Sequence, residues 1–133
     1  MIVISIIAIL LTTVLPGYQS QLIKTGRIAA QSELLRVVAR QEHYWVLNRQ
    51  YADTLSQLGY PSGPYAIGAD GEWLPVASNK RIYLINLSEV DAQAFTVSAV
   101  PQLSQSRDTR CGTLQINALG VKASNDGSHR ACW

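Results

Sequence analysis

The chain has 133 residues and a formal net charge of +2. This length allows one domain with a modest core and excludes two domains of ordinary size. The net charge is too small to identify a partner, and the sequence contains no run of like charge. Residues 51–106 are acidic overall and both ends of the chain are mildly basic. A solvated surface accounts for this distribution.

The N-terminal segment Ile2–Leu15 carries no charge. Its fourteen residues fall short of the roughly 20 that span a bilayer as a helix. A signal-peptide core has this length, but no basic segment precedes it and no small-residue cleavage site follows. We predict that residues 1–15 form a helix that is buried outside the domain. The apolar side chains of this helix are Ile2, Val3, Ile4, Ile6, Ile7, Ile9, Leu10, Leu11, Val14 and Leu15.

A helical pattern resumes after Pro16 and Gly17 and continues to about residue 50. Apolar residues recur there at intervals of three and four, which predicts an amphipathic helix over residues 16–50. The residues of this predicted apolar face are Ala30, Leu34, Val37, Val38, Gln41, Tyr44 and Trp45. Pro16 and Gly17 predict a kink or a melted turn between the two halves.

Two signals disagree about the side of the membrane on which the rest of the chain lies. Lys24 and Arg27 follow the apolar segment, and the positive-inside rule places them in the cytoplasm. A disulfide between Cys111 and Cys132 would place the domain outside the cytosol. We favour the second placement, because a flank preceding Met1 would carry charges of its own.

Residues 51–79 are rich in Gly, Pro, Ala and Asp, so we expect an irregular connection with a short helix at Asp53–Leu58. Alternating patterns then predict three strands. These strands are Lys80–Leu87, Ala94–Val100 and Thr113–Ala118, followed by a turn at 118–121 into a short return strand. Short connections favour an antiparallel sheet, and the amphipathic helix is the obvious cover for its apolar face. The predicted fold class is therefore α+β, with a long helix on three or four antiparallel strands formed by residues 80–133.

Cys111 and Cys132 are the only cysteines, and their spacing does not fit a CxxC redox or zinc pair. The segment between them is rich in glycine, and a bridge closing a loop of about 20 residues stabilises a fold by roughly 3 kcal/mol. We expect an oxidised bridge, with two free cytosolic thiols as the alternative.

No pattern of residues predicts catalysis, a cofactor or a metal. His43 and His129 have no carboxylate or thiol at triad or ligand spacing, and no phosphate loop or dinucleotide fingerprint occurs. A candidate basic patch at the tip of the head consists of Arg107, Arg110, Lys122 and Arg130, with Trp133 able to stack on a base. Solvated surface is the alternative interpretation of these four cations.

Landmarks at both ends of the chain, in order, resemble those of the type IV pilins, and most closely the PilE-like minor pilins. The apolar segment is interrupted by Pro16 before Tyr18 and Gln19, and the long helix closes on RQEHYW at residues 40–45. Leu58-Gly59-Tyr60 is the next landmark. The C-terminal pattern is the most specific: FTVSA at 95–99, Cys111-Gly112 and the final Cys132-Trp133.

This resemblance implies a lollipop fold in which residues 16–133 form one head on the helix. It also implies insertion into the inner membrane with the head in the periplasm, removal of a leader, and N-methylation of the new terminus. The family's leader, cleavage site and following acidic residue would precede Met1. Subunits would then pass into an extracellular helical filament whose core consists of the N-terminal helices.

The resemblance thus implies a minor pilin that acts in pilus biogenesis, twitching motility and adhesion. Its partners would be other pilin subunits, the inner membrane and the pilus assembly machinery. A pseudopilin of type II secretion is one alternative, which the cysteine loop ending in Cys132-Trp133 disfavours. A pilus-tip subunit that binds DNA or a surface through its basic residues is the other.

Overall fold

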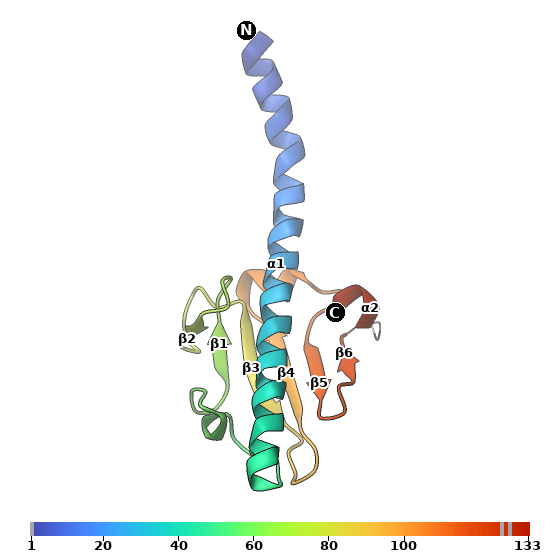
Figure 1. The fold of residues 1–133 in the computed structure, drawn as a ribbon. Helices are drawn as coiled ribbons and strands as arrows, with labels where there is room; N and C mark the ends of the chain where they lie inside the picture. The colour runs from blue at the N-terminus through green and yellow to red at the C-terminus, as the bar shows by residue number, and fades with distance from the viewer. Residues whose placement is uncertain (1, 126, 128) are drawn as a thin grey trace.

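A computed structural model describes residues 2–125, 127 and 129–133, and for residues 13–16 and 129 it describes the backbone alone. Helix α1 spans Ile2–Asn48, and its first half projects from a head formed by the rest of the chain (Figure 1). At 1.5 Å per residue, α1 is about 70 Å long. The predicted α+β lollipop is confirmed in its outline, a long helix packed on an antiparallel sheet.

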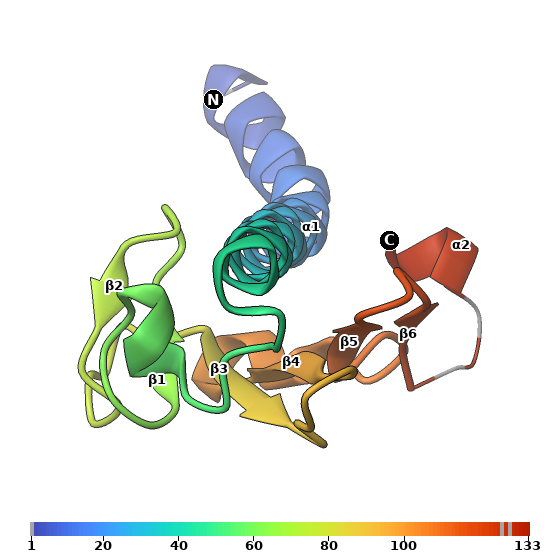
Figure 2. The ribbon, with the colours of Figure 1, turned by 60° about the horizontal axis from the view of Figure 1, so that its bottom comes forward.

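The head contains one antiparallel sheet of six strands in the order β2-β1-β3-β4-β5-β6. The elements in chain order are the 3₁₀ helix η1 Leu55–Leu58, β1 Tyr65–Ile67, β2 Trp73–Leu74, β3 Tyr83–Ser88, β4 Thr96–Pro101, the 3₁₀ helix η2 Leu103–Arg107, β5 Leu114–Asn117, β6 Lys122–Ala123 and α2 His129–Cys132. Figure 2 shows that α1 lies across one face of this sheet, over its central strands.

The structure corrects the predicted number of strands. The sheet has six strands rather than three or four, because β1 and β2 lie in the segment 51–79 that the sequence predicts as irregular. These two strands have three and two residues. Strands so short contain no readable alternation, and all three residues of β1 are buried. The three predicted strands correspond to β3, β4 and β5, and the short return strand to β6.

The core forms where the buried side of α1 meets the inner face of the sheet. Ala30, Leu34 and Val37 are fully buried on α1. They pack in one cluster with alternate sheet residues, such as Tyr83 and Ile85 of β3. The helical spacing of the first group and the alternation of the second are the two periodicities that bring apolar side chains to a single face.

Helix α1 continues through Pro16 and Gly17 without interruption. The predicted melted turn is therefore wrong. Proline lacks one N–H, so it removes one hydrogen bond of the helix, and the turns on either side hold their geometry. Figure 1 shows that α1 is not straight above the head, and a kink at Pro16 stays a prediction.

Candidate functional site

The first candidate surface is the apolar start of α1, which lies outside the head. Its described apolar side chains are 52–78% exposed. They are Ile2, Val3, Ile4, Ile6, Ile7, Ile9, Leu10 and Leu11; the side chains of Val14 and Leu15 lie outside the described residues. Helix α1 contains an 18-residue window long and apolar enough to cross a membrane. Exposed apolar surface of this extent marks a surface that another molecule or a membrane covers.

A second apolar surface continues along α1 beside the head. Ile28, Leu35 and Val46 are 59%, 47% and 63% exposed. At 3.6 residues per turn these three side chains lie within about 20° of one another around the helix axis. Ala30 and Val37, which are buried against the sheet, lie on the opposite side. Helix α1 is thus apolar on both its inward and its outward faces.

The predicted disulfide joins Cys111 to Cys132, with Cα atoms 5.5 Å apart, and it closes the C-terminal loop of the head. Two contacts fix this loop to α1. Arg27 donates from Nε and Nη2 to both carboxylate oxygens of Asp108, at 3.0 and 2.9 Å. Gln31 donates from Nε2 to the carbonyl of Cys132 at 2.6 Å. The loop is therefore held by a covalent bond within itself and by polar bonds to the helix.

The four predicted basic residues are all exposed, but they do not form one patch. Arg107 of η2 and Arg110 line a hollow of about 680 Å³ beside α1, together with Lys24. Lys122 lies on β6, where its Nζ is 5.2 Å from the centre of the Trp133 ring. Lys122 therefore lies over the Trp133 ring, which the sequence predicts as able to stack on a base. The indole Nε1 of Trp133 donates a hydrogen bond to the carbonyl of Ala123 at 3.0 Å.

The predicted position at the tip of the head is wrong for Arg107, Arg110 and Arg130, whereas Lys122 lies further along the sheet, opposite Ile116. Strand β4 ends, and β5 begins, at the end of the sheet from which the free half of α1 emerges (Figure 1). Helices η2 and α2 therefore lie at that end, and Gln19 of α1 lines a cavity with Arg107. The distal end instead carries exposed acidic residues, which are Glu42, Asp53, Glu89 and Asp91. The sequence alone could not show which end of the head carries which charges, because that arrangement depends on the directions of the strands.

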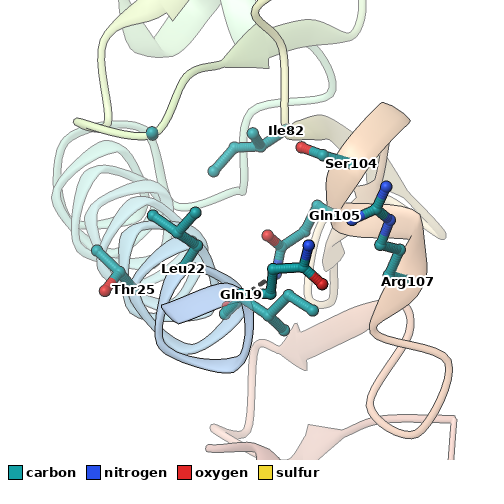
Figure 3. Close-up of a pocket in the computed structure, with 10 residues that line it drawn as sticks. Gln19, Leu22, Thr25, Ile82, Ser104, Gln105 and Arg107 are labelled. Atoms are coloured by element: carbon teal, nitrogen blue, oxygen red, sulfur yellow. Dashed lines mark hydrogen bonds between the residues drawn. The ribbon is translucent and has the colours of Figure 1, made fainter. Parts of the chain in front are cut away.

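A cavity of about 210 Å³ lies between α1 and η2, and its lining residues are drawn in Figure 3. Leu22 and Ile82 contribute apolar walls, and Arg107 lies at its η2 side. Gln105 closes the floor by donating from Nε2 to the carbonyl of Ile23 at 2.9 Å and to the hydroxyl of Tyr83 at 3.1 Å. The cavity thus lies between α1 and the head at the point along α1 where the helix projects beyond the sheet.

A buried carboxylate, Glu33, is the feature that the sequence analysis missed. Its side chain is 1% exposed and accepts hydrogen bonds from the Tyr65 hydroxyl at 2.6 Å and from Trp73 Nε1 at 2.9 Å. Arg36 pairs with it at 3.3 Å. Burial, and then the hydrogen bond to Glu33, raise the pKa of Tyr65 above its usual range. Glu33 thereby ties β1 and β2 to α1.

Arg40 lies over the aromatic side chains beside Glu33. Its guanidinium is 4.3 Å from the centre of the Tyr60 ring, and the Tyr60 ring stacks on Tyr65 at 5.2 Å. Trp73, on the edge strand, is 45% exposed. Within the described residues this cluster holds no second carboxylate, so we interpret it as the structural link between α1 and the edge of the sheet. His43 is exposed on α1, and the side chain of His129 lies outside the described residues.

Comparison with known proteins identifies the family. The model of a family described as "Type IV minor pilin ComP, DNA uptake sequence receptor" matches residues 16–115, well over half of the chain. The fold is similar to a solved type IV pilin from Shewanella oneidensis, with a TM-score of 0.53 and 23% identity over 83% of this chain and 97% of that one. A comparison with curated proteins finds no match. The chain therefore belongs to the ComP family of type IV minor pilins and is a subunit of the pilus.

Proposed function

We propose that the head of this minor pilin binds double-stranded DNA, while α1 anchors the subunit in the inner membrane and later in the filament. The observation that carries the DNA proposal is the separation of charge on the head. Arg107, Arg110, Lys122 and Arg130 lie in or beside the cysteine loop and are exposed, although they do not form one patch, whereas the exposed acids Glu42, Asp53, Glu89 and Asp91 lie at the distal end. A duplex carries a dense row of phosphates and is attracted to the basic side chains.

The anchoring role rests on the apolar surface of α1. In a bilayer, Ile2–Leu11 would be covered by lipid; in a filament, the same side chains would be covered by helices of other pilin subunits. Apolar burial is similar in both environments, so helix packing and contacts between heads would decide between them. The outward residues Ile28, Leu35 and Val46 would extend the filament contact alongside the head.

The head would lie in the periplasm before assembly. The disulfide between Cys111 and Cys132 supports this placement, because disulfides persist outside the reducing cytosol. Lys24 and Arg27 oppose it under the positive-inside rule. Arg27, however, is paired with Asp108, so it adds little net charge to the flank of the membrane helix.

The DNA-binding surface would consist of Arg110, Lys122 and Arg130, which follow the cysteine loop from η2 to α2. Exposed cations can contact phosphates, and such contacts position a protein on DNA without reading its sequence. The ComP family is described as a DNA uptake sequence receptor, which supports DNA as the ligand.

The test is the salt dependence of DNA binding by the full chain in detergent, measured by fluorescence anisotropy with a labelled duplex. Each phosphate contact contributes about 0.9 to the slope of log K against log salt concentration. The double variant Lys122→Gln/Arg130→Gln should therefore lower that slope by about 1.8 and weaken binding at low salt.

A matched control variant removes the same net charge elsewhere. Arg49 and Lys80 are exposed and lie outside the cysteine loop, so Arg49→Gln/Lys80→Gln should leave the slope unchanged. Equal slopes for all three proteins would contradict the proposed surface. No measurable binding of the unsubstituted chain at low salt would contradict DNA as a ligand.

The pseudopilin alternative is tested in the native host. A clean deletion of the gene should reduce surface pili and twitching motility. A defect in protein secretion with intact pili would assign the subunit to type II secretion instead.

A further inference from the structure

We propose that Lys24 and Arg107, which we call the basic collar, bind the anionic headgroups of the membrane in which α1 is anchored. This inference rests on the proposed membrane anchoring of α1. The collar would hold the head on the bilayer before assembly, in an orientation that extraction into a filament must break.

The collar lies at the level where the chain would leave the bilayer. Residues 2–23 contain no charged side chain, and Lys24 is the first cation of α1. About 20 such residues span the hydrocarbon core of a bilayer. Lys24 would therefore lie in the headgroup region, close to the start of the buried face at Gly26.

Arg107 reaches the same level from a distant part of the sequence. It lines the 680 Å³ hollow with Lys24, and both hollow and cavity include Gln19 of α1. In Figure 3, Gln19 lies between Leu22 of α1 on one side of the cavity and Arg107 of η2 on the other. Lys24 of α1 and Arg107 of η2 thus line one hollow at the end of the head from which the free half of α1 emerges.

The electrostatic balance of this hollow is positive. Its charged residues are Lys24, Arg27, Arg107, Asp108 and Arg110. The one carboxylate among them, Asp108, has a side chain 4% exposed and is engaged by Arg27. Lys24 and Arg107 are exposed, and neither has an ion-pair partner among the residues that the structure describes. Free cations at a headgroup surface are attracted to anionic lipid.

The collar is one-sided, which predicts a tilt. The turn between β1 and β2 also lies at this end of the head, since Ala69 lines the cavity with Arg107. That turn carries the acids Asp70 and Glu72, which are both exposed. We therefore expect the side of the head bearing η2 to approach the bilayer and the side bearing β2 to lie away from it.

The experiment uses the full chain in lipid nanodiscs, either of neutral phosphatidylcholine or with about one third phosphatidylglycerol, since each cation near an anionic surface contributes about 1 kcal/mol. A donor fluorophore at Ser106, an exposed residue of η2, reports energy transfer to acceptor-labelled headgroups. Transfer should be higher in anionic discs, and the difference should disappear at about 1 M salt, where the Debye length is about 3 Å.

The variant Lys24→Gln/Arg107→Gln should lower the ratio of docked to free heads in anionic discs by about 25-fold, or roughly fivefold for each cation. The control Arg49→Gln removes a cation at the distal end of α1, outside both proposed surfaces, and it should leave the ratio unchanged. Equal energy transfer in the two kinds of nanodisc would contradict the proposed collar. An equal fall in the ratio of docked to free heads for the collar variant and the control would also contradict it.

Two further outcomes separate this proposal from the others. Failure of the chain to copurify with discs of either lipid would refute the membrane anchoring and the collar with it. Copurification without lipid-dependent transfer would refute the collar alone. If the collar variant loses affinity for a DNA duplex while its lipid signal stays unchanged, Lys24 and Arg107 belong to the DNA surface and the inference is wrong.

Discussion

At the scale of single residues, buried polar side chains link α1 to the head. Gln41 is fully buried and bonds both backbone groups of Ala52, accepting from its N–H at 2.8 Å and donating to its carbonyl at 2.9 Å. Glu33 links β1 and β2 to the helix in a similar way, through Tyr65 and Trp73. Buried polar groups are costly when one partner is lost, so these side chains fix a single position of the helix on the sheet.

Replacing Glu33 tests this interpretation. Glu33→Gln keeps the shape of the side chain but removes the charge that receives two hydrogen bonds and pairs with Arg36. Losing such bonds in a buried site should lower the free energy of unfolding of the head by about 1–3 kcal/mol. Urea denaturation measures the change.

Glu42→Gln is the matched control, because Glu42 is exposed on the same helix and accepts an exposed bond from Tyr51. Its effect should stay within about 0.5 kcal/mol. Equal losses for the two variants would show that the Glu33 network does not stabilise the fold.

Tyr83 predicts how stability changes at alkaline pH. Burial raises the pKa of Tyr83 to about 12, although the hydrogen bond that Gln105 donates opposes the shift. Above the ordinary tyrosine value of 10.0 the unfolded chain loses a proton that the folded chain keeps. Stability from this group is therefore fully present below pH 10 and falls as the pH rises towards 12, by about 1.4 kcal/mol per pH unit.

The variant Tyr83→Phe removes this titrating group. Between about pH 9 and 11, its free energy of unfolding should fall less than that of the unsubstituted chain, by about 1–2 kcal/mol. Urea denaturation at both pH values gives the comparison, and identical pH profiles would contradict the burial of Tyr83 as the cause.

At the scale of elements, Gly26 allows a close approach of α1 and η2. A Cβ atom there would lie 2.5 Å from Gln105 Oε1 and 3.2 Å from a methyl of Ile82. Gln105 cannot move away freely, since it is bonded to the Ile23 carbonyl and the Tyr83 hydroxyl. A glycine inside a helical pattern is a signal for such a close approach.

Gly26→Ala should therefore destabilise the head. Alanine is the better helix former by about 1 kcal/mol, but displacing Gln105 costs two buried hydrogen bonds of about 1–3 kcal/mol each. We expect a net loss of about 1–5 kcal/mol by thermal or urea unfolding. Gly17→Ala, where nothing lies within 4 Å, should be neutral or stabilising; a stabilising Gly26→Ala would contradict the close packing.

The elements that the sequence predicts are those whose pattern is long enough to read. In α1 and in strands β3, β4 and β5, the apolar residues recur with the period of the element over enough residues to identify it. Strands β1 and β2 could not be predicted, because they are too short and pair only through the sheet.

The candidate sites also divide into those that local sequence predicts and those that only the completed fold shows. The disulfide and the exposed apolar helix follow from local composition. The pairing of Arg27 with Asp108 joins residues 81 apart, and that of Glu33 with Trp73 joins residues 40 apart. Contacts at such separations depend on the completed topology, which also decides that the basic residues lie near the free half of α1.

At the scale of the whole molecule, the subunit has an apolar shaft, a basic end of the head beside it and an acidic distal end. If α1 is anchored as proposed, the subunit would exchange one apolar environment for another at little cost in burial, so weak electrostatic contacts of the head would influence when it leaves the membrane. The basic end of the head would then be available to other anionic partners.

The most direct test is photo-crosslinking in the native host, with a photoreactive amino acid in place of Ile7, an exposed residue of α1. Sheared pili are purified and crosslinked products are identified by mass spectrometry. We expect the chain in the pilus fraction, in few copies, crosslinked to the N-terminal helix of another pilin subunit. A chain that stays in the membrane fraction, or one found in pili without such crosslinks, would contradict the role of α1 in the filament core.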